Sequence, residues 1–583
     1  VLIFNIQKQQ YIVIRYTNRL PIMIHLLIFL NLFSSITSSP LQKRAYTPLP
    51  LGTIAPQGWL LEQLILQANA LSGVMATSTF PGANTVNQSL WIGGNGQPKP
   101  YGSGVTQWLP YWTNGQIPLI ELLVAANVTD RLDSTFDLIN VCEDIVQYIL
   151  AHTNKTNGWI GPYLNEPGDT NGHGLWDPLN MLRTLLNYAQ AHPEHESSVV
   201  TAVVSHLTHT TELLNGGDPV IDWASTRWPT YVEIAQYVLD NFIEKYGTDS
   251  SVMPLGKEKT TQMLVNSSWI FRNQGMDWLS YYNQNGTVKF PEKDVNGWNQ
   301  NDHGVNNAEG AMRWPGVVHR MDGANDTSGQ TDMHQVLKML DTYQGQVQSL
   351  FCADEVFCGR APHRGTETCA VVEAMASLEY NYAVFGDEES QLMDRIERLA
   401  FNAMPAALTS DMWTHVYVQQ ANSVFAGIST PKNAKEAKEA KDAKDTYWDP
   451  SRRHHDLHYL HYDNSKEVTD VPSGEDQTAN FYGVSHFPCC ITNFPQGWPK
   501  FAQHVFMMDN DVTTPILLVS KACRFRFLLL LPTSNLFLKH PNKSFFNVIN
   551  ILTLLHTLFI LYIINKYQSF SFQRQIFLNR CFG

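Results

Sequence analysis

The sequence predicts an all-α-dominant fold built as a ring of helical hairpins. From residue 55 to residue 408, apolar residues recur at the three- and four-residue spacing of amphipathic helices, and the alternation typical of β-strands is scarce. Loops rich in glycine, proline and asparagine, such as 158–168, separate the helical stretches. Many helices of ordinary length joined by elaborate loops indicate a toroid whose loops at one end form a pocket.

The expected helices share an apolar stripe that would face a core. The first carries it on Trp59, Leu60, Leu61, Leu64, Ile65 and Ala68. The others are expected over residues 136–150, 179–188, 231–246, 333–350, 368–384 and 392–404. With 583 residues, 44% of them hydrophobic, the chain can bury one large domain, with or without a small companion. The net charge of −13 argues against nucleic-acid binding, which depends on clustered basic residues.

The N-terminal region has the pattern of a secretory signal. Residues 1–22 show no recognisable pattern and are expected to be a non-native upstream extension. Residues 23–44 combine a short apolar run at 26–33 with small residues and the dibasic pair Lys43-Arg44, which predicts a signal peptide and a mature start at Ala45. Because the apolar run is too short to span a bilayer, we expect a secreted, extracellular protein without stable membrane insertion.

Sequons for N-glycosylation support secretion and predict a glycoprotein. They begin at Asn87, Asn127, Asn154, Asn266, Asn285 and Asn325. Two later segments differ from the helical region. The low-complexity charged run 435–445, inside an insertion at 432–446, is expected to be exposed and without a catalytic role. Residues 509–583 show neither strand alternation nor capped helices and are expected to be a gene-model artefact, which leaves 45–508 as the catalytic domain.

Four residues form a candidate metal-binding set. Cys489 and Cys490 are adjacent, and Glu367 and Cys369 are two positions apart. Three sulfurs and one carboxylate would suit a tetrahedral Zn²⁺ site. In a secreted protein the default for cysteines is disulfide pairing, but a disulfide between neighbouring residues closes a strained ring and is rare.

Cys352 and Cys358 are six positions apart in a loop. They form either a local disulfide or two free thiols.

Three segments resemble glycoside hydrolase family 127, the β-L-arabinofuranosidase-like family once described as a domain of unknown function. They are 353–357 (ADEVF), 365–369 (GTETC) and 489–500 (CCITNFPQGWPK), and two expected loops, 110–115 (PYWTNG) and 303–306 (HGVN), also match. The resemblance covers about 47–508 and suggests a secreted, fungal-type member. It implies an (α/α)6 barrel, the six-hairpin glycosidase toroid, followed by a β-sandwich that is here expected to be truncated or replaced.

The resemblance also implies roles for individual residues. Glu367, Cys369, Cys489 and Cys490 would bind Zn²⁺, and Cys489 would act as the nucleophile. The catalytic acid/base would be Glu355, with Asp354 as the local rival, whose alternative role is to cap a loop or helix. This division is chemically coherent, because metal coordination deprotonates a thiol and a carboxyl group of raised pKa can protonate the leaving group.

Other candidate residues have two possible roles each. His303 resembles a histidine that hydrogen-bonds the sugar, or it is a structural loop histidine. His415 and Tyr417 either line the pocket or pack in the core. Glu373 either supports the metal ligands or forms a helix salt bridge. Asn114 stands where the relatives carry aspartate, which leaves the substrate open.

The sequence therefore predicts a secreted retaining glycoside hydrolase that uses zinc. Its expected substrates are arabinose-containing plant glycans, from which it would release β-L-arabinofuranose or a similar sugar from non-reducing ends. The alternatives are a non-catalytic carbohydrate-binding protein with a structural zinc, and a polysaccharide lyase that would use a tyrosine or histidine base. The exact sugar, the linkage and the oligomeric state do not follow from the sequence.

Overall fold

The computed structural model describes most of the chain. The described residues are 2–6, 10–14, 41–77, 89–93, 107–162, 173–295, 297–322, 328–360, 362, 364–386, 391–421, 481–483, 487–510 and 517–519. Most of the expected signal peptide at 23–44, the charged insertion 432–446 and most of 509–583 lie outside them. The sequons at Asn87 and Asn325 also begin outside the described residues.

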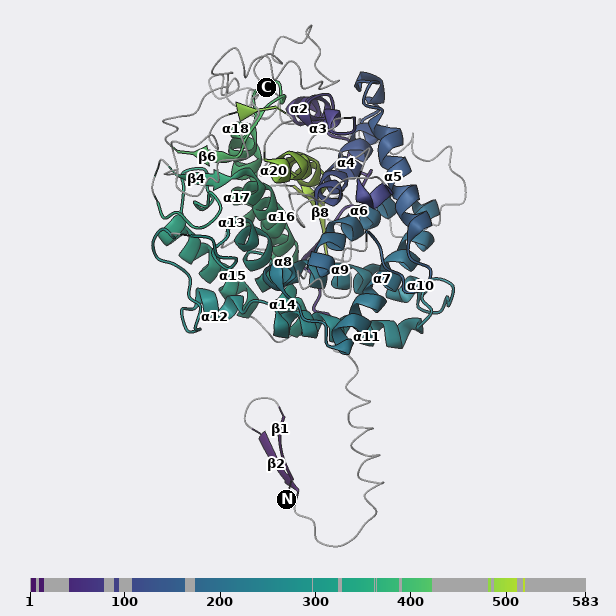
Figure 1. Ribbon diagram of the computed structural model, residues 1–583, viewed down its shortest axis with the longest axis vertical. Coiled ribbons are helices and arrows are strands. Elements are labelled where there is room, and N and C mark those ends of the chain that lie inside the picture. The colour runs from purple at the N-terminus through teal and green to yellow at the C-terminus, as the bar shows by residue number, and fades with distance from the viewer. Residues whose placement is uncertain are drawn as a thin grey trace, which may run out of the picture.

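Six helical segments form an inner ring whose first and last members meet. They are α4 (Trp108–Ala125), α6 (Asp177–Ala191), α9 (Trp228–Asn241), α13 (Gly304–Asn306) with the π-helical turn Asn307–Ala311 and α14 (Trp314–Asp322), α16 (Thr368–Phe385), and α20 (Pro488–Asn493) with α21 (Gly497–His504). Each segment packs against the next, and α20 and α21 pack against α4, which closes the ring. The colours of Figure 1 follow this circle from blue helices on the right, through teal helices at the bottom, to green helices on the left.

Six further helices surround the inner ring. They are α2 (Gly58–Ala68), α5 (Leu138–His152), α7 (Glu196–Gly216), α11 (Gly256–Gln274), α15 (Ser328–Met339) and α17 (Leu392–Arg398). Each packs against at least one inner helix that is its neighbour in the chain. Because outer and inner helices alternate along the described chain, the predicted (α/α)6 toroid is confirmed.

Burial differs between the two rings. The outer helix α5 buries one stripe, Leu138, Cys142, Ile145, Val146 and Ile149, and leaves its other side toward solvent. The inner helix α4 is buried on all sides from Trp108 to Ile120. An outer helix therefore shows the amphipathic pattern that sequence analysis detects, whereas an inner helix does not have to.

The remaining named helices and strands are short. The short helices are α3 (Leu71–Val74), α8 (Asp222–Thr226), α10 (Ile243–Tyr246), α12 (Trp278–Tyr282) and α18 (Met404–Ala406). The strands are β1 (Leu2–Ile6), β2 (Gln10–Ile14), β3 (Tyr46–Pro48), β4 (Gly365–Glu367), β5 (His415–Val416), β6 (Val418–Gln420), β7 (Phe481–Tyr482), β8 (Phe506–Asp509) and β9 (Leu517–Val519). They pair antiparallel as β1-β2, β3-β8-β9, β4-β6 and β5-β7.

Four expectations about local structure were wrong. The helix expected over 333–350 ends as α15 at Met339 and a π-helical turn to Gln344, because Gly345 turns into extended backbone and pairs with Phe351. The expected helix 231–246 is divided at Phe242 into α9 and α10. Residues 110–115 are not a loop but lie inside α4. The other expected loop, 303–306, is also helical, because residues 304–306 form α13.

No helix among the described residues is both long and apolar enough to cross a bilayer.

Candidate metal centre and active site

Four side chains from three segments converge into one cluster, which we call the cysteine cluster. Glu367, Cys369, Cys489 and Cys490 offer ligand atoms that all lie within 4.8 Å of one another. Cys369 Sγ lies 3.2 Å from Cys490 Sγ. Glu367 Oε1 lies 3.8 Å from Cys490 Sγ and 4.0 Å from Cys489 Sγ. The structure thus brings together the four residues that the sequence predicted as zinc ligands.

Two helix N-termini place these side chains. Glu367 is the last residue of β4 and the N-cap of α16, so Cys369 lies in the first turn of α16. The adjacent cysteines lie in the first turn of α20, directly after Phe487, whose φ of 49° is left-handed. A left-handed φ is costly for a bulky residue, which indicates that its surroundings fix this turn. Because α16 and α20 pack against each other in the inner ring, both halves of the cluster meet.

The cluster fits a zinc ion. Around a tetrahedral Zn²⁺ with Zn–S bonds of about 2.3 Å, sulfur ligands lie about 3.8 Å apart. Cys369 Sγ and Cys490 Sγ are closer, at 3.2 Å, and all four ligand atoms lie within 4.8 Å of one another, so the group is compact enough to surround one ion. Glu367 Oε2 is buried and has no hydrogen-bond partner among the described residues. A buried carboxylate oxygen without a partner is unfavourable, and a cation held by the cluster would satisfy it. Glu367, Cys369, Cys489 and Cys490 are therefore the residues that would hold the metal.

Electrostatics single out one of the three thiols. Hydrogen bonds from Cys369 and Cys490 lower the pKa of the Cys489 thiol well below its ordinary value, against the opposing effect of burial. Burial raises the pKa of both Cys369 and Cys490 well above the ordinary value. Burial, followed by the charges of Glu355 and Cys489, also raises the pKa of Glu367. The residue that most readily forms a thiolate is therefore Cys489, which is also the least buried of the three.

Glu355 lies beside the cysteine cluster on its exposed side. Its Oε2 is 3.3 Å from His303 Nε2, and Tyr417 donates its hydroxyl hydrogen to Oε1. The same His303 nitrogen lies 4.0 Å from Glu367 Oε2, so His303 stands between the two carboxylates. The side chain of Glu355 is 60% exposed, whereas that of Glu367 is 4% exposed. Glu355 is thus the carboxylate of this pair that solvent and a substrate can reach.

The protonation of His303 follows from its position at a helix start. His303 is the N-cap of α13, and its Nδ1 accepts the backbone N–H of Asn306 at 3.3 Å. Because Nδ1 accepts, Nε2 carries the hydrogen and donates it toward Glu355. Burial raises the pKa of Glu355, but the hydrogen bonds from His303 and Tyr417 bring its net pKa below the ordinary value.

Asp354 forms an ion pair with Arg364. Arg364 donates to both of its carboxylate oxygens, from Nε at 2.8 Å and from a terminal nitrogen at 2.6 Å. A bidentate pair of this kind fixes both groups. The geometry therefore favours Glu355 over Asp354 as the carboxyl group that faces the cluster.

Short backbone pairings hold the loop that carries Glu355. His303 pairs with Val356, and Gly304 N–H donates to the Glu355 carbonyl at 2.8 Å. A Cβ at Gly304 would lie 2.4 Å from Ala353 Cβ, so glycine permits this close approach. The loop is also closed by a disulfide between Cys352 and Cys358, which resolves the two alternatives for that pair.

The structure places His415 and Tyr417 differently. Tyr417, between β5 and β6, stacks on Phe487 with ring centroids 4.3 Å apart and contacts Glu355, so it belongs to the site. His415 in β5 is fully buried, with its ring 6.5 Å from that of Phe487. This burial favours a packing role for His415 over contact with a substrate.

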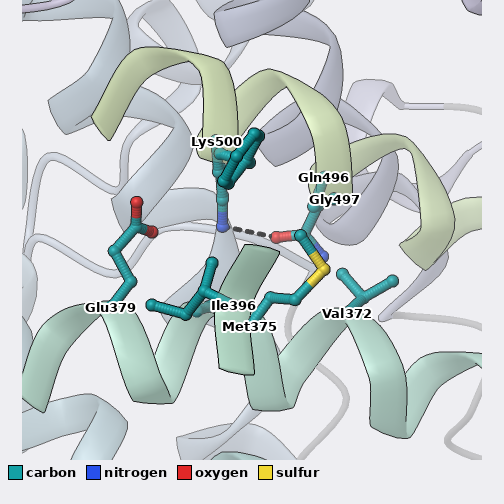
Figure 2. A pocket seen from close by; sticks show the side chains of 9 residues that line it. Val372, Met375, Glu379, Ile396, Gln496, Gly497 and Lys500 are labelled. Carbon is teal, nitrogen blue, oxygen red and sulfur yellow. Dashed lines mark hydrogen bonds between the residues drawn. The ribbon is translucent and has the colours of Figure 1, made fainter. Parts of the chain in front are cut away.

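A buried hydrogen-bond chain links the two helices of the cluster. Asn493 Nδ2 donates to Glu373 Oε1 at 3.2 Å, and Gln496 Nε2 donates to Asn493 Oδ1 at 2.7 Å. Gln496 Oε1 accepts from Lys500 Nζ at 2.6 Å, as Figure 2 shows in the small hollow between α16 and α21. Glu373 therefore supports the ligands through Asn493, three residues after Cys490.

Asn114 belongs to this same buried chain. Its Nδ2 donates to Gln496 Oε1 at 2.6 Å. Sequence analysis did not identify the hydrogen-bonding roles of Asn493 and Gln496, because both residues lie in a Pro-rich segment without an apolar helical stripe.

A second missed feature lies beneath His303. Arg227 is 3% exposed and donates to Asn306 Oδ1 at 2.7 Å and to Tyr111 OH at 2.9 Å. Its guanidinium lies 4.7 Å from the ring centre of Trp176 and 4.5 Å from that of Trp223. This buried cation lowers the pKa of Glu367, against the larger opposing effect of burial, and so favours its anionic form.

Comparison with known proteins finds structural likeness without a match in sequence. No protein-family model matches the chain, and no curated protein matches it either. Solved structures similar to it include a β-arabinofuranosidase of family GH127 (TM-score 0.48, 11% identity, covering 80% of this chain and 63% of that one). A second is a structure titled glycoside hydrolase (TM-score 0.44, 10% identity, covering 81% of this chain and 63% of that one). A third is a GH127 β-L-arabinofuranosidase from Geobacillus stearothermophilus T6 (TM-score 0.46, 12% identity, covering 82% of this chain and 67% of that one). The chain thus spans less than two thirds of the first two.

Proposed function

We propose that this protein is a secreted, retaining glycoside hydrolase that releases β-L-arabinofuranose, or a closely similar sugar, from plant glycans. The observation that carries the proposal is the pairing of a low-pKa thiol, Cys489, with an exposed carboxylate, Glu355, beside one buried cysteine cluster. Retention requires a nucleophile on one face of the anomeric carbon and an acid/base on the other. The sugar itself is proposed from the sequence motifs at 353–357, 365–369 and 489–500.

In the first step Cys489 Sγ attacks the anomeric carbon. A carbon–sulfur bond forms while the glycosidic carbon–oxygen bond breaks, and the protonated Glu355 gives its proton to the leaving oxygen. His303 and Tyr417 hydrogen-bond the two oxygens of Glu355 and so orient it. Both contacts lower the pKa of Glu355, contrary to the raised pKa expected of the acid, so Glu355 has to take up a proton before the first step and is already the carboxylate that the second step needs.

In the second step Glu355 acts as a base. It takes a proton from water, the water oxygen attacks the anomeric carbon, and the carbon–sulfur bond breaks with the electron pair returning to Cys489 as a thiolate. In the metal-free cluster, hydrogen bonds from the Cys369 and Cys490 thiols lower the pKa of Cys489 and make it a better leaving group. Zn²⁺ held by the cluster would supply the charge that keeps the thiols deprotonated.

Secretion is part of the proposal. The disulfide between Cys352 and Cys358 supports it, because such bonds persist mainly in oxidising compartments. Metal binding would also protect the three nearby thiols of the cluster from oxidation there.

The test combines metal content with turnover. The protein beginning at Ala45 and its Cys489→Ser variant are assayed for zinc and for hydrolysis of an aryl β-L-arabinofuranoside. About one zinc per chain, with turnover that collapses in the variant, supports the proposal. Zinc without turnover in either protein would contradict the activity, and absence of zinc would contradict the metal centre.

A further inference from the structure

An exposed tryptophan lies beside the site. Trp298 is 59% exposed, and its ring centre lies 5.0 Å from that of His303 and 5.7 Å from that of Trp223. The rings of Trp223 and His303 are themselves 5.1 Å apart, so the three form one group. A large apolar ring open to solvent next to polar catalytic groups indicates a surface that contacts a ligand.

The group is held in place from below. The Arg227 guanidinium lies 4.5 Å from the ring centre of Trp223 and is itself fixed by Asn306 and Tyr111. Trp223 therefore rests on a buried, hydrogen-bonded cation and presents a fixed support to Trp298. A fixed aromatic surface binds a sugar at low entropic cost, because the C–H groups on one face of a sugar ring pack flat against it.

Burial shows which part of a substrate would reach Trp298. The ligand atoms of Cys369 and Cys490 lie at the buried end of the site, and Glu355 lies at its exposed end. Glu355 delivers a proton to the leaving oxygen, so the leaving group lies on its side. Trp298 contacts His303, the partner of Glu355, and is equally exposed.

We propose that Trp298, supported by Trp223, binds the sugar ring of the leaving group. This inference rests on the proposed glycosidase function and narrows its substrate class. The substrate is an oligosaccharide or polysaccharide in which a second sugar follows the released arabinofuranose, and the apolar face of that second sugar lies on the indole of Trp298. A glycoside with a small alcohol as its leaving group would not use Trp298.

The test compares two substrates with different leaving groups. The zinc-loaded full chain, its Trp298→Ala variant and a matched control, Trp269→Ala, are assayed on a β-L-arabinofuranosyl disaccharide and on methyl β-L-arabinofuranoside. Trp269 is also an exposed tryptophan, 38% exposed, but it lies on α11 and packs on Arg272. Zinc content is measured for all three proteins.

The expected result is selective. Trp298→Ala lowers kcat/KM on the disaccharide about tenfold, as expected for loss of one aromatic contact, and changes kcat/KM on the methyl glycoside by less than about twofold. Trp269→Ala leaves both values unchanged. Equal losses on both substrates would show that Trp298 acts through His303 and would overturn the inference, as would no loss on either.

Failure of the proposed function is distinguishable from failure of this site. If the unaltered protein hydrolyses neither substrate, the glycosidase proposal is wrong, and binding of the disaccharide is then measured by calorimetry. Binding that Trp298→Ala weakens about tenfold, with Trp269→Ala unchanged, still supports the sugar site. Absent binding, or equal binding by all three proteins, overturns it.

Discussion

The Sγ atoms of Cys369 and Cys490 lie 3.2 Å apart although the residues are 121 positions apart in the chain. The closure of the inner ring creates this contact, because α20 is packed between α4 and α16. One half of the cysteine cluster depends on α16 and the other on α20, so whatever holds these helices together also holds the metal site together.

The hydrogen bond from Asn493 to Glu373 should therefore increase the affinity of the cysteine cluster for zinc. Asn493→Ala removes the amide that donates to Glu373 and leaves a buried carboxylate oxygen without this partner. We expect a loss of stability of about 1–3 kcal/mol and a 10- to 100-fold loss of zinc affinity. Chelator competition measures the affinity, with Asn140→Ala on the exposed side of α5 as the control. Unchanged zinc affinity would show that zinc binding does not depend on the hydrogen bond between Asn493 and Glu373.

Substitution of Glu355 should lower kcat much more than substitution of Asp354. Glu355→Gln removes the acid and base, so kcat should fall about 10²- to 10⁴-fold with zinc content unchanged. Asp354→Asn weakens the pair with Arg364 but leaves the proton donor in place, so its loss should be much smaller. Added azide should restore turnover of an activated aryl glycoside only in Glu355→Gln, because azide can attack without a base. The reverse ranking of the two variants would make Asp354 the acid.

The disulfide should stabilise the loop that carries Glu355. Closing a loop with a sequence separation of six residues contributes about 2 kcal/mol by the chain-entropy relation. The double variant Cys352→Ala, Cys358→Ala should lose about that much stability in urea unfolding and should show a lower kcat at unchanged zinc content. A variant is preferable to a reductant here because thiol reductants also bind zinc. Cys142→Ala, a buried free cysteine on α5, is the control. A full kcat in the double variant would contradict the positioning role.

His206 should make the fold sensitive to acid. Burial, with a smaller effect of His209, lowers the pKa of His206 from 6.5 to about 3, and its Nδ1 accepts the Ile160 N–H. Below pH 6.5 the unfolded chain gains a proton that the folded chain does not, so this contribution to stability is present above pH 6.5 and declines toward pH 3. The difference reaches roughly 5 kcal/mol at most.

The check is the urea midpoint between pH 7 and pH 4. His206→Gln keeps an acceptor for the Ile160 N–H but cannot take up a proton, so its stability should fall less steeply with acid than that of the unaltered protein. Parallel curves for the two proteins would show that His206 does not cause the acid sensitivity.

The sequence predicted most reliably those helices that have one side exposed to solvent. Helix α5 shows the apolar stripe because its other face meets solvent. Helix α4 is buried all round from Trp108 to Ile120 and contains Gly115 and Pro118, so its residues 110–115 were interpreted as a loop. Amphipathic spacing arises where one side of a helix faces the core and the other side faces water. The buried part of an inner helix has no side that faces water, so its sequence does not have to show this spacing.

The cysteine cluster was predictable because its residue types are chemically restrictive. Adjacent cysteines and a Glu-x-Cys pair admit few roles. By contrast, Trp298, Arg227 and Asn493 gain their meaning only from neighbours that are distant in the chain, and their residue types have many uses. The resemblance already favoured Glu355 over Asp354, and the fold adds a physical reason, because Arg364 forms a bidentate pair with Asp354.

The central claim is that Cys489 becomes bonded to the sugar, and peptide mass spectrometry tests it most directly. The Glu355→Gln variant is mixed with an activated aryl β-L-arabinofuranoside, quenched in acid and digested. The activated leaving group needs little protonation, whereas hydrolysis of the intermediate lacks its base, so the intermediate should accumulate. The account predicts one pentosyl group on Cys489 and none after the additional change Cys489→Ser. A pentosyl group on a carboxylate or on Cys490, or no adduct at all, would contradict it.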